Sequence, residues 1–436
     1  MRQYFQFEEN NTNYRTEIIG GLTTFLTMSY IIFVNPVILS AANMDVNAVR
    51  VATCISAAIG TLLMGVLAKY PIAQAPAMGH NAFFAFVVCG TLGYQWPVAL
   101  GAVFISGIIF AVMSVFQLWG GLVKAIPNSI KHSIAVGIGL LIALIGLEYG
   151  GLVVDHPSTL INLGDFANPA VIITLVGIVV MAVLMTLNVP GAILWGLLVA
   201  ALVGLPLGVV EYHGTVSLPP PLKPTLFKLD IIGAFETGLV PIIFVFFFLD
   251  LFDTVGTLIG VSAQAGFLKE GKLPRTNRAM LADSIATLTG ACMGTSTVTS
   301  YIESTTGISQ GARTGFANLI TAIFFLLALF FNPLAEMIGG TYQNTMHPVI
   351  APALIVVGYM MMRSVVHINW EEITEAIPAF LTIIIMPFTF SITEGISFGF
   401  ISYSLLKTIK GQARQVHWVI HLFALLFVLR YVFLST

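Results

Sequence analysis

The stretch Phe244-Val245-Phe246-Phe247-Phe248-Leu249-Asp250-Leu251-Phe252-Asp253-Thr254-Val255-Gly256-Thr257 places two carboxylic acids inside an otherwise apolar run. A charged residue at the centre of a membrane costs at least about 2.5 kcal/mol, so such residues face a cavity, a partner or a transport path. We therefore interpret this stretch as a membrane-spanning helix with a functional polar face. Asp250 and Asp253 stand three residues apart, so they share one side of that helix.

The composition of the whole chain agrees with a membrane protein. Of its 436 residues, 57% are hydrophobic and only 9% are charged, whereas a soluble domain carries about 25% charged residues. The mean hydropathy is +0.94. Apolar runs recur along the chain, which predicts an all-α polytopic membrane protein embedded in a lipid bilayer. No basic tract suggests a nucleic-acid partner.

Apolar runs divide the chain into two sets of predicted spans. A polar, proline-rich stretch over residues 211–230 separates the sets. The first set is expected near residues 17–40, 48–68, 76–92, 97–119, 131–149, 169–188 and 190–210. The second set is expected near residues 237–264, 279–293, 296–309, 315–333, 347–366, 375–391 and 393–410. A last apolar stretch near 416–434 either crosses the membrane or does not, and the side of the C-terminus depends on this.

A fixed spacing between the halves indicates an internal duplication. Pro127 and Pro348 each open an apolar run and lie 221 residues apart, and Val136 and Val357 keep the same spacing. The third span of each half is irregular and rich in small and polar residues. An odd number of spans per repeat places the two halves in opposite orientations. We therefore expect about fourteen transmembrane segments in a 7+7 inverted repeat, with short extended stretches in segments 3 and 10.

Basic residues are unevenly distributed between the two sides of the predicted topology. With the N-terminus inside, only Arg50, Lys223, Lys228 and Arg430 of the 18 Lys and Arg residues fall outside. The positive-inside rule therefore predicts a cytoplasmic N-terminus. The expected location is the plasma membrane, which is the inner membrane in a bacterium. The basic residues expected on the cytoplasmic side are Arg2, Arg15, Lys69, Lys124, Lys131, Lys269, Lys272, Arg275, Arg278, Arg313, Arg363, Lys407, Lys410 and Arg414.

Two interpretations of the acidic pair compete. One is an internal structural network in which a carboxylate caps or bridges a neighbouring helix. The other is a substrate or proton site. Asp250 lies one turn deeper in the apolar run, so we favour it for substrate contact. Asp253 is assigned either to the shell of the site or to a structural or proton-relay role. Thr254 extends the same polar stripe.

A second acid, Glu303, lies in a segment with many hydroxyl groups that extends from Thr295 to Gly307. Its β-branched residues suit a short extended stretch that leads into a helix. Non-helical backbone at membrane depth occurs where it lines a cavity or is buried in protein, and such a broken helix exposes amide donors at its N-terminal end. Close packing of a Ser- and Thr-rich helix is the alternative. The acid favours a binding site.

The matching segment of the first half covers residues 75–84. Pro76 and Gly79 are placed to interrupt a helix. Asn81 offers both a donor and an acceptor to a ligand with alternating polar groups. His80 is either a proton carrier or a structural residue. Phe83 could stack on a flat ring, although most phenylalanines here are expected to face lipid or other helices.

The remaining acids of the apolar regions are weaker candidates, and no catalytic residue is expected. The chain has no H-E-x-x-H motif, and its three cysteines show no metal-ligand spacing. We therefore expect no enzyme, no metal and no cofactor. Capping or interfacial roles are expected for Glu148, Asp283, Glu336 and Glu394.

Several motifs in order resemble one known family, the AzgA-like purine nucleobase permeases of the nucleobase:cation symporter 2 group. The stretch from Thr16 to Pro36 is similar to the opening helix of that family. The motifs Gly79-His80-Asn81-Ala82-Phe83-Phe84, Asp250-Leu251-Phe252-Asp253-Thr254-Val255-Gly256-Thr257 and Ser300-Tyr301-Ile302-Glu303-Ser304 resemble its third, eighth and tenth segments. His80 and Ala77 depart from the family, which commonly has an apolar or small residue and a glycine at these positions.

The resemblance implies the fold of uracil and xanthine permeases, in which a core domain moves against a gate domain. Segments 1–4 and 8–11 would form the core from residues 1–125 and 237–334. Segments 5–7 and 12–14 would form the gate from residues 126–212 and 335–436, the latter including the last apolar stretch. Residues 213–236 would link the halves. A homodimer is a further expectation from related folds.

The resemblance also implies that Asp250 and Glu303 bind a purine nucleobase, with Asn81 and Gly79 shaping the pocket. His80, Phe83, Thr254 and Ser300 are candidates for the pocket shell. Burial disfavours the charged form of a carboxyl group, so Glu303, Asp250 or Asp253 could load a proton with the base. We therefore expect a secondary active transporter, a purine nucleobase:proton symporter that works by alternating access. Guanine, hypoxanthine and adenine remain alternative substrates.

An anion transporter or channel on the same inverted-repeat architecture is the second hypothesis. Anion binding favours a basic residue or bare helix N-termini at mid-membrane. The charges expected at that depth are acidic, which favours the nucleobase.

Overall fold

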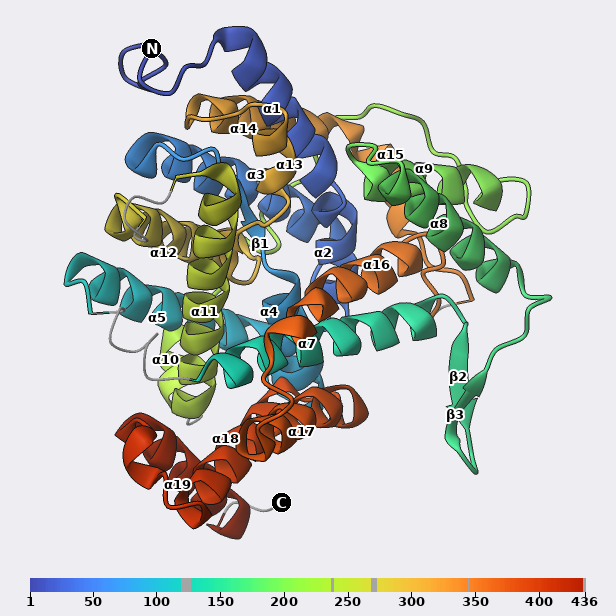
Figure 1. The fold of residues 1–436 in the computed structure, drawn as a ribbon. Helices are drawn as coiled ribbons and strands as arrows, with labels where there is room; N and C mark the ends of the chain where they lie inside the picture. Colours follow the sequence, from blue (N-terminus) through green and yellow to red (C-terminus); the bar gives the residue numbers. More distant parts are fainter. Residues whose placement is uncertain (119–126, 237–238, 268–272, 344, 434–436) are drawn as a thin grey trace. The chain divides into compact units, whose positions relative to one another are not determined.

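The computed structural model describes residues 1–118, 127–236, 239–267, 273–343 and 345–433, and the chain is mostly helical (Figure 1). Lys124, Lys269 and Lys272 of the predicted basic loops lie outside these ranges. Seven of the described helices are long and apolar enough to cross a membrane. They cover Tyr14–Ser40, Val46–Ala68, Trp96–Val115, Asn128–Tyr149, Pro169–Thr186, Pro241–Ser262 and Phe316–Gly339. The protein is therefore a multi-pass membrane protein.

The elements of the first half follow the predicted spans closely. In chain order they are α1 (Tyr14–Met28), α2 (Ile31–Ser40), α3 (Val46–Leu63), η1 (Met64–Ala68), β1 (Gln74–Pro76), α4 (Met78–Ala82), η2 (Phe83–Thr91), α5 (Trp96–Val115), α7 (Asn128–Tyr149), β2 (Val153–His156), β3 (Leu160–Leu163), α8 (Pro169–Thr186) and α9 (Ala192–Gly204). The strands β2 and β3 form an antiparallel hairpin after α7, and no span or strand was expected there.

The second half begins after the proline-rich stretch. Its elements are α10 (Ile231–Glu236), α11 (Val240–Ala265), α12 (Thr276–Met293), β4 (Val298–Ser300), α13 (Ser304–Ser309), α14 (Phe316–Ala328), η3 (Leu329–Phe331), α15 (Asn332–Gly339), α16 (Ala351–Met362), η4 (Arg363–His367), α17 (Ile373–Thr389), α18 (Ile392–Ile409), η5 (Ala413–Gln415) and α19 (Trp418–Phe433). The stretch at 244–257 lies within α11, as the first interpretation requires.

The chain forms two compact units. One contains Met1–Gln117 and Gly146–Ala353, and the other contains Leu118–Ile145 and Leu354–Thr436. In the second unit α17 packs on α18, and α18 packs on α19. The backbones of Gly139 and Gly358 approach each other closely there, because a side chain at either glycine would collide with the other's carbonyl oxygen. The predicted site residues all belong to the first unit.

Packing inside the first unit repeats with opposite chain direction. Strand β1 pairs antiparallel with β4, with Ala75 opposite Thr299, and each strand leads into a short helix, α4 or α13. Helices α1 and α3 both contact α14, and their counterparts α11 and α12 both contact α5. These reciprocal contacts are what an inverted repeat produces. The two short strands lie at its centre, as Figure 1 shows for β1.

The non-helical backbone at the centre is satisfied by hydrogen bonds between the halves. The amide of Ala77 donates to the carbonyl of Thr297 (2.9 Å), and the amide of Tyr301 donates to the carbonyl of Ala73 (3.0 Å). Because Pro76 has no N–H, it needs no acceptor for that group in the strand. Buried backbone groups without partners would cost several kcal/mol in a membrane. The two breaks therefore support each other.

Candidate functional site

Two broken helices define the candidate site. Helix α4 starts directly after β1, and α13 starts three residues after β4. Helices α3 and α12 hold the strands in equivalent ways. The Thr61 hydroxyl donates to the carbonyl of Gln74 (3.0 Å), and the Thr287 hydroxyl donates to the carbonyl of Val298 (2.9 Å). Each strand of the pair leads into a short helix, and the first turn of each short helix presents amide donors.

Asp250 is buried and only half satisfied. Its side chain points from α11 toward α12, where Oδ2 accepts from the hydroxyl of Thr287 (3.1 Å). The other oxygen, Oδ1, is buried and has no hydrogen-bond partner among the described residues. An unsatisfied buried acceptor costs about 1–3 kcal/mol, so this atom needs a donor, which a protonated Asp283 beside it, water or a ligand can supply. This agrees with the substrate-contact interpretation of Asp250.

Glu303 stands at the start of α13 and is also buried. Its Oε1 accepts a hydrogen bond from the hydroxyl of Tyr30 at 2.7 Å. Tyr30 lies at the junction of α1 and α2, which the sequence analysis treated as one continuous span. Nothing local in the sequence marks Tyr30 as a site residue, because its partner Glu303 is distant in the chain.

Asn81 and Gly79 are both buried in α4. The Oδ1 atom of Asn81 accepts from the hydroxyl of Ser296, which lies in the segment before β4. Among the residues that the structure describes, the amide nitrogen of Asn81 contacts the sulfur of Met78 at 4.0 Å, which is a weak interaction. Its carbonyl oxygen is the atom held by a strong partner, the hydroxyl of Ser296.

Asp283 corrects one expectation of the sequence analysis. It was assigned a capping or interfacial role, but it is fully buried inside α12. Its Oδ1 accepts from Gln74 Nε2 (2.7 Å) and Ser300 Oγ (2.9 Å), and its Oδ2 accepts from Thr254 Oγ1 (2.6 Å). Gln74 belongs to β1 and Ser300 to β4, so this carboxylate joins the two breaks. The local signal was misleading because Asp283 lies only two turns from the start of its helix.

Asp253 occupies a different environment from Asp250. It is exposed on a face of α11 that also carries Gly256, and a side chain at Gly256 would meet nothing within 4 Å. Asp253 lies close enough to Glu303 for the two carboxylates to interact electrostatically. The structure therefore places Asp253 beside Glu303, and Asp250 beside Asp283.

The remaining shell candidates are packed into the protein. Phe83 is fully buried and meets Phe246 of α11 edge to face, with ring centroids 4.9 Å apart. The hydroxyls of Thr254 and Ser300 are engaged with Asp283. His80 is buried, and its Nε2 has no hydrogen-bond partner among the described residues.

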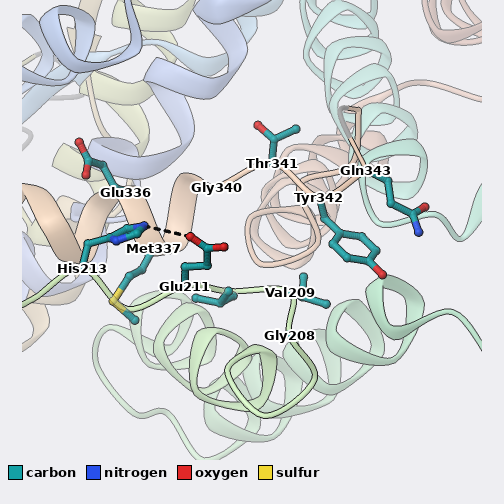
Figure 2. Close-up of a pocket in the computed structure, with 11 residues that line it drawn as sticks. Gly208, Val209, Glu211, His213, Glu336, Met337, Gly340, Thr341, Tyr342 and Gln343 are labelled. Atoms are coloured by element: carbon teal, nitrogen blue, oxygen red, sulfur yellow. Dashed lines mark ion pairs between the residues drawn. The ribbon is translucent and has the colours of Figure 1, made fainter.

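A cavity of about 340 Å³ lies elsewhere in the first unit (Figure 2). Its walls come from the segment after α9 and from α15 with the loop that follows it. Glu211 and His213 form a solvent-exposed pair there at 3.6 Å, and Glu336 accepts from Asn332 at 2.9 Å. None of the predicted site residues is among the described residues that line this cavity.

The described residues contain no cluster of three or more His, Cys, Asp or Glu that could hold a metal ion. Two stretches, 307–311 and 395–399, fit the G-x-S-x-G pattern of a hydrolase nucleophile. Ser309 lies at the end of α13, and Ser397 lies inside α18. Both hydroxyls donate to a carbonyl of their own helix, that of Thr306 and that of Thr393 (both 2.7 Å). Neither serine lies on the strand-to-helix turn that the hydrolase motif requires.

Similarity to known proteins matches this geometry. Residues 15–398 match the xanthine/uracil permease group, described as a permease family. The chain belongs to this family. The permease is 44% identical over 436 residues to the adenine permease AdeP of Escherichia coli strain K12, covering 100% of this chain and 96% of the relative. It is 43% identical over 447 residues to the guanine/hypoxanthine permease PbuG of Bacillus subtilis strain 168, covering 100% of both. The expected membership of a purine nucleobase permease family is confirmed.

The fold of the permease also occurs in a solved structure. The transmembrane domain of the cyanobacterium bicarbonate transporter BicA matches 89% of this chain and 97% of its own length, with a TM-score of 0.66. The sequence identity is 14%, so this likeness concerns the fold alone. It confirms a helical, inverted-repeat transporter fold for the permease.

Proposed function

We propose that this permease transports a purine nucleobase together with a proton by alternating access. The observation that carries the proposal is the unpartnered Oδ1 of the buried Asp250, in the same compact unit as Glu303 and Asn81. A purine base has N–H donors and ring acceptors along its edge. Relatives that cover the whole chain are an adenine permease and a guanine/hypoxanthine permease. This supports a purine substrate and leaves the choice between those bases to experiment.

In the proposed site, Asp250 and Glu303 accept N–H groups of the base, and Asn81 donates to one of its acceptors. Gly79 keeps the backbone of α4 open to the flat ring. The amide ends of α4 and α13 add donors for ring nitrogens or carbonyl oxygens. A neutral base is well suited to such a site because its binding adds no net charge to the membrane interior.

For coupling, we propose that one of Glu303, Asp250 and Asp253 takes up a proton with the base. A proton moving inward gains about 2.3 kcal/mol per 100 mV of membrane potential, and this energy would drive accumulation. The electrostatic interaction of Asp253 with Glu303 supports uptake of a proton by one of them, because neighbouring carboxylates disfavour double ionisation.

The proposed motion involves a core of residues 1–125 and 237–334 and a gate of residues 126–212 and 335–436, connected by the linker 213–236. We propose about fourteen spans in total, with the N-terminus in the cytoplasm. The last helix, α19, would complete the gate half. The charge distribution of the sequence supports this orientation.

Uptake into proteoliposomes tests the proposal. Labelled hypoxanthine, guanine and adenine are supplied with and without an inward proton gradient, and labelled sulfate and bicarbonate test the anion alternative. We expect gradient-dependent accumulation of at least one purine that a protonophore abolishes. We expect Glu303→Gln and Asp250→Asn to lose accumulation, whereas Glu211→Gln, at an exposed position just before the linker, retains it. Accumulation by both site variants, or uptake of the anions alone, would overturn the proposal.

A further inference from the structure

Tyr30 is fully buried at a break in the first membrane span. Helix α1 ends at Met28 and α2 starts at Ile31, so Tyr30 lies between them. Two hydroxyls near the break bond back to their own helix: Thr27 donates to the carbonyl of Thr23 (2.8 Å), and Ser29 donates to that of Leu26 (3.0 Å). Such bonds bend helices. The junction directs the phenol of Tyr30 toward the start of α13.

Glycines allow α1 and α13 to approach closely enough for this contact. A side chain at Gly307 would lie 2.1 Å from the Thr24 hydroxyl and 2.4 Å from the carbonyl oxygen of Gly20. Below the glycines, the carboxylate of Glu17 accepts from the amides of Arg313 (2.9 Å) and Thr314 (3.3 Å), just after α13. Glu17 of α1 and Tyr30, which follows α1, therefore contact the two ends of α13.

The contact at the start of α13 involves the carboxylate of Glu303, which binds the base in the proposed site. Tyr30 donates to Oε1 of Glu303 at 2.7 Å, and no other side chain among the described residues donates to that carboxylate. The backbone amide of Glu303 itself also interacts with the carboxylate, and because a carboxylate has about four acceptor positions, acceptor capacity is left for a ligand N–H. A phenol hydroxyl both donates and accepts, so it can hold Glu303 in its ionised and in its protonated form.

We propose that Tyr30 is the positioning residue for Glu303: it occupies one carboxylate oxygen and orients the other toward the base. This inference rests on the proposed function, in which Glu303 contacts the base. Tyr30 itself touches no substrate atom. A hydrogen bond to a charged group contributes about 1.5–3 kcal/mol net, which corresponds to a factor of about 10 to 100 in affinity.

A double-mutant cycle with a matched tyrosine tests the inference. Binding of labelled hypoxanthine, guanine and adenine to purified protein is measured for Tyr30→Phe, Glu303→Gln and the double variant. Tyr301→Phe is the control, because this tyrosine is also buried but its hydroxyl donates to the backbone carbonyl of Pro76. We expect Tyr30→Phe to weaken binding about 10-fold or more, and to have a clearly smaller effect once Glu303 is Gln, because a hydrogen bond to a neutral amide oxygen is weaker than one to a carboxylate. Tyr301→Phe is expected to have the same effect in both backgrounds.

An infrared measurement on ligand-free protein gives a second readout that does not depend on residual binding. The carboxyl band that Glu303→Gln removes is expected to shift in Tyr30→Phe and to stay in place in Tyr301→Phe. An unchanged band, or equal losses of binding in both backgrounds, would overturn the positioning role. If Glu303→Gln binds the bases as the unaltered protein does, the proposed function itself fails. If Glu303→Gln loses binding but Tyr30→Phe binds normally, only the positioning role of Tyr30 fails.

Discussion

The two breaks at the centre of the first unit, β1–α4 and β4–α13, have similar backbones and different side chains. Each is a three-residue strand leading into a short helix, and the two strands pair with each other. Yet the first break carries the neutral side chains of Gln74, His80 and Asn81, whereas the second carries Glu303. Their surroundings differ as well, because only the second break is held against α1 by glycine contacts and by Tyr30.

The comparison distinguishes what the shared backbone contributes to the site from what the side chains contribute. The shared backbone builds a place where two helix N-termini meet, and neither half could satisfy its broken backbone alone. The different side chains make the two sides of the site chemically different: the first break carries amide groups, and the second carries a carboxylate. We expect the first break to contribute recognition of the base, and the second to contribute both recognition and charge. Four predictions test this comparison.

The largest effect is expected where the second break is packed against α1. Replacing Gly307 with Ala places a methyl group within 2.4 Å of the Gly20 carbonyl oxygen, and overpacking of this kind costs about 3 kcal/mol. The midpoint of thermal unfolding in detergent should fall markedly. Gly256→Ala is the matched control, because nothing lies within 4 Å of a side chain there. Equal unfolding midpoints for the two variants would contradict the packing described here.

A smaller loss is expected when the link between the breaks is removed. Asp283→Ala leaves the donors of Gln74, Ser300 and Thr254 without their acceptor. Unsatisfied buried donors cost about 1–3 kcal/mol each, so we expect a destabilisation of about 2 kcal/mol after partial relaxation. The same measurement of thermal unfolding checks this. Glu148→Ala, which removes a partly exposed acid, serves as the control and should change the midpoint far less.

The two breaks themselves should differ in their contribution to affinity. Asn81→Ala removes neutral hydrogen bonds, each of which contributes about 0.5–1.5 kcal/mol, so binding of the preferred base should weaken about 10-fold. Glu303→Gln should weaken it by more, because its bond involves a charged group. Equilibrium binding to purified protein compares the two variants. A greater loss for Asn81→Ala would reverse the roles assigned to the breaks.

The smallest effect is expected for a charge outside the membrane. The ammonium of Lys410 lies 2.7 Å from Glu372, and its hydrogen bond lowers the pKa of that carboxyl to about 2. Because the pKa of Glu372 is lowered, the pair stabilises the folded state at every pH above the ordinary pKa of a glutamate. This stabilisation is lost only as the pH falls through about 2. The difference in unfolding midpoint between the unaltered protein and Glu372→Gln should therefore be small and constant from about pH 5 to 8.

A midpoint difference that disappears between these pH values would contradict the lowered pKa of Glu372. Glu371→Gln is the control, because the structure records no ion pair for Glu371 among the described residues. Together with the binding variants, this result would show that charge matters at the second break and little at the membrane surface.

Much of the helical architecture was predictable from local patterns. The apolar run at 244–257 lies within a helix, and the predicted spans at 48–68, 131–149 and 169–188 agree with the observed helices within a few residues. Hydropathy succeeds here because a membrane helix satisfies its own backbone and is read from consecutive residues. Residues 14–40 form one apolar span, as predicted, but the interruption between α1 and α2 at Ser29 and Tyr30 was not predicted.

The candidate site was predictable in part. Asp250, Glu303 and Asn81 were identified because polar residues stand out in an apolar sequence, and the structure places all three in one unit. Tyr30, Glu17 and the central role of Asp283 were not identified. A tyrosine or an acid near a helix end has many ordinary explanations, and its partner lies hundreds of residues away along the chain.

The sequence by itself determined that this protein is a multi-pass membrane protein, where acids interrupt its apolar runs, and which family it resembles. These properties depend on residues close together in the chain and on the cost of placing charge in lipid. Only the tertiary structure decided that β1 pairs with β4, that Asp283 joins the two breaks, and that Tyr30 holds Glu303. Those contacts arise when two halves of opposite orientation satisfy each other's buried polar groups. Hydropathy is calculated from consecutive residues, so it cannot predict which distant residues pair.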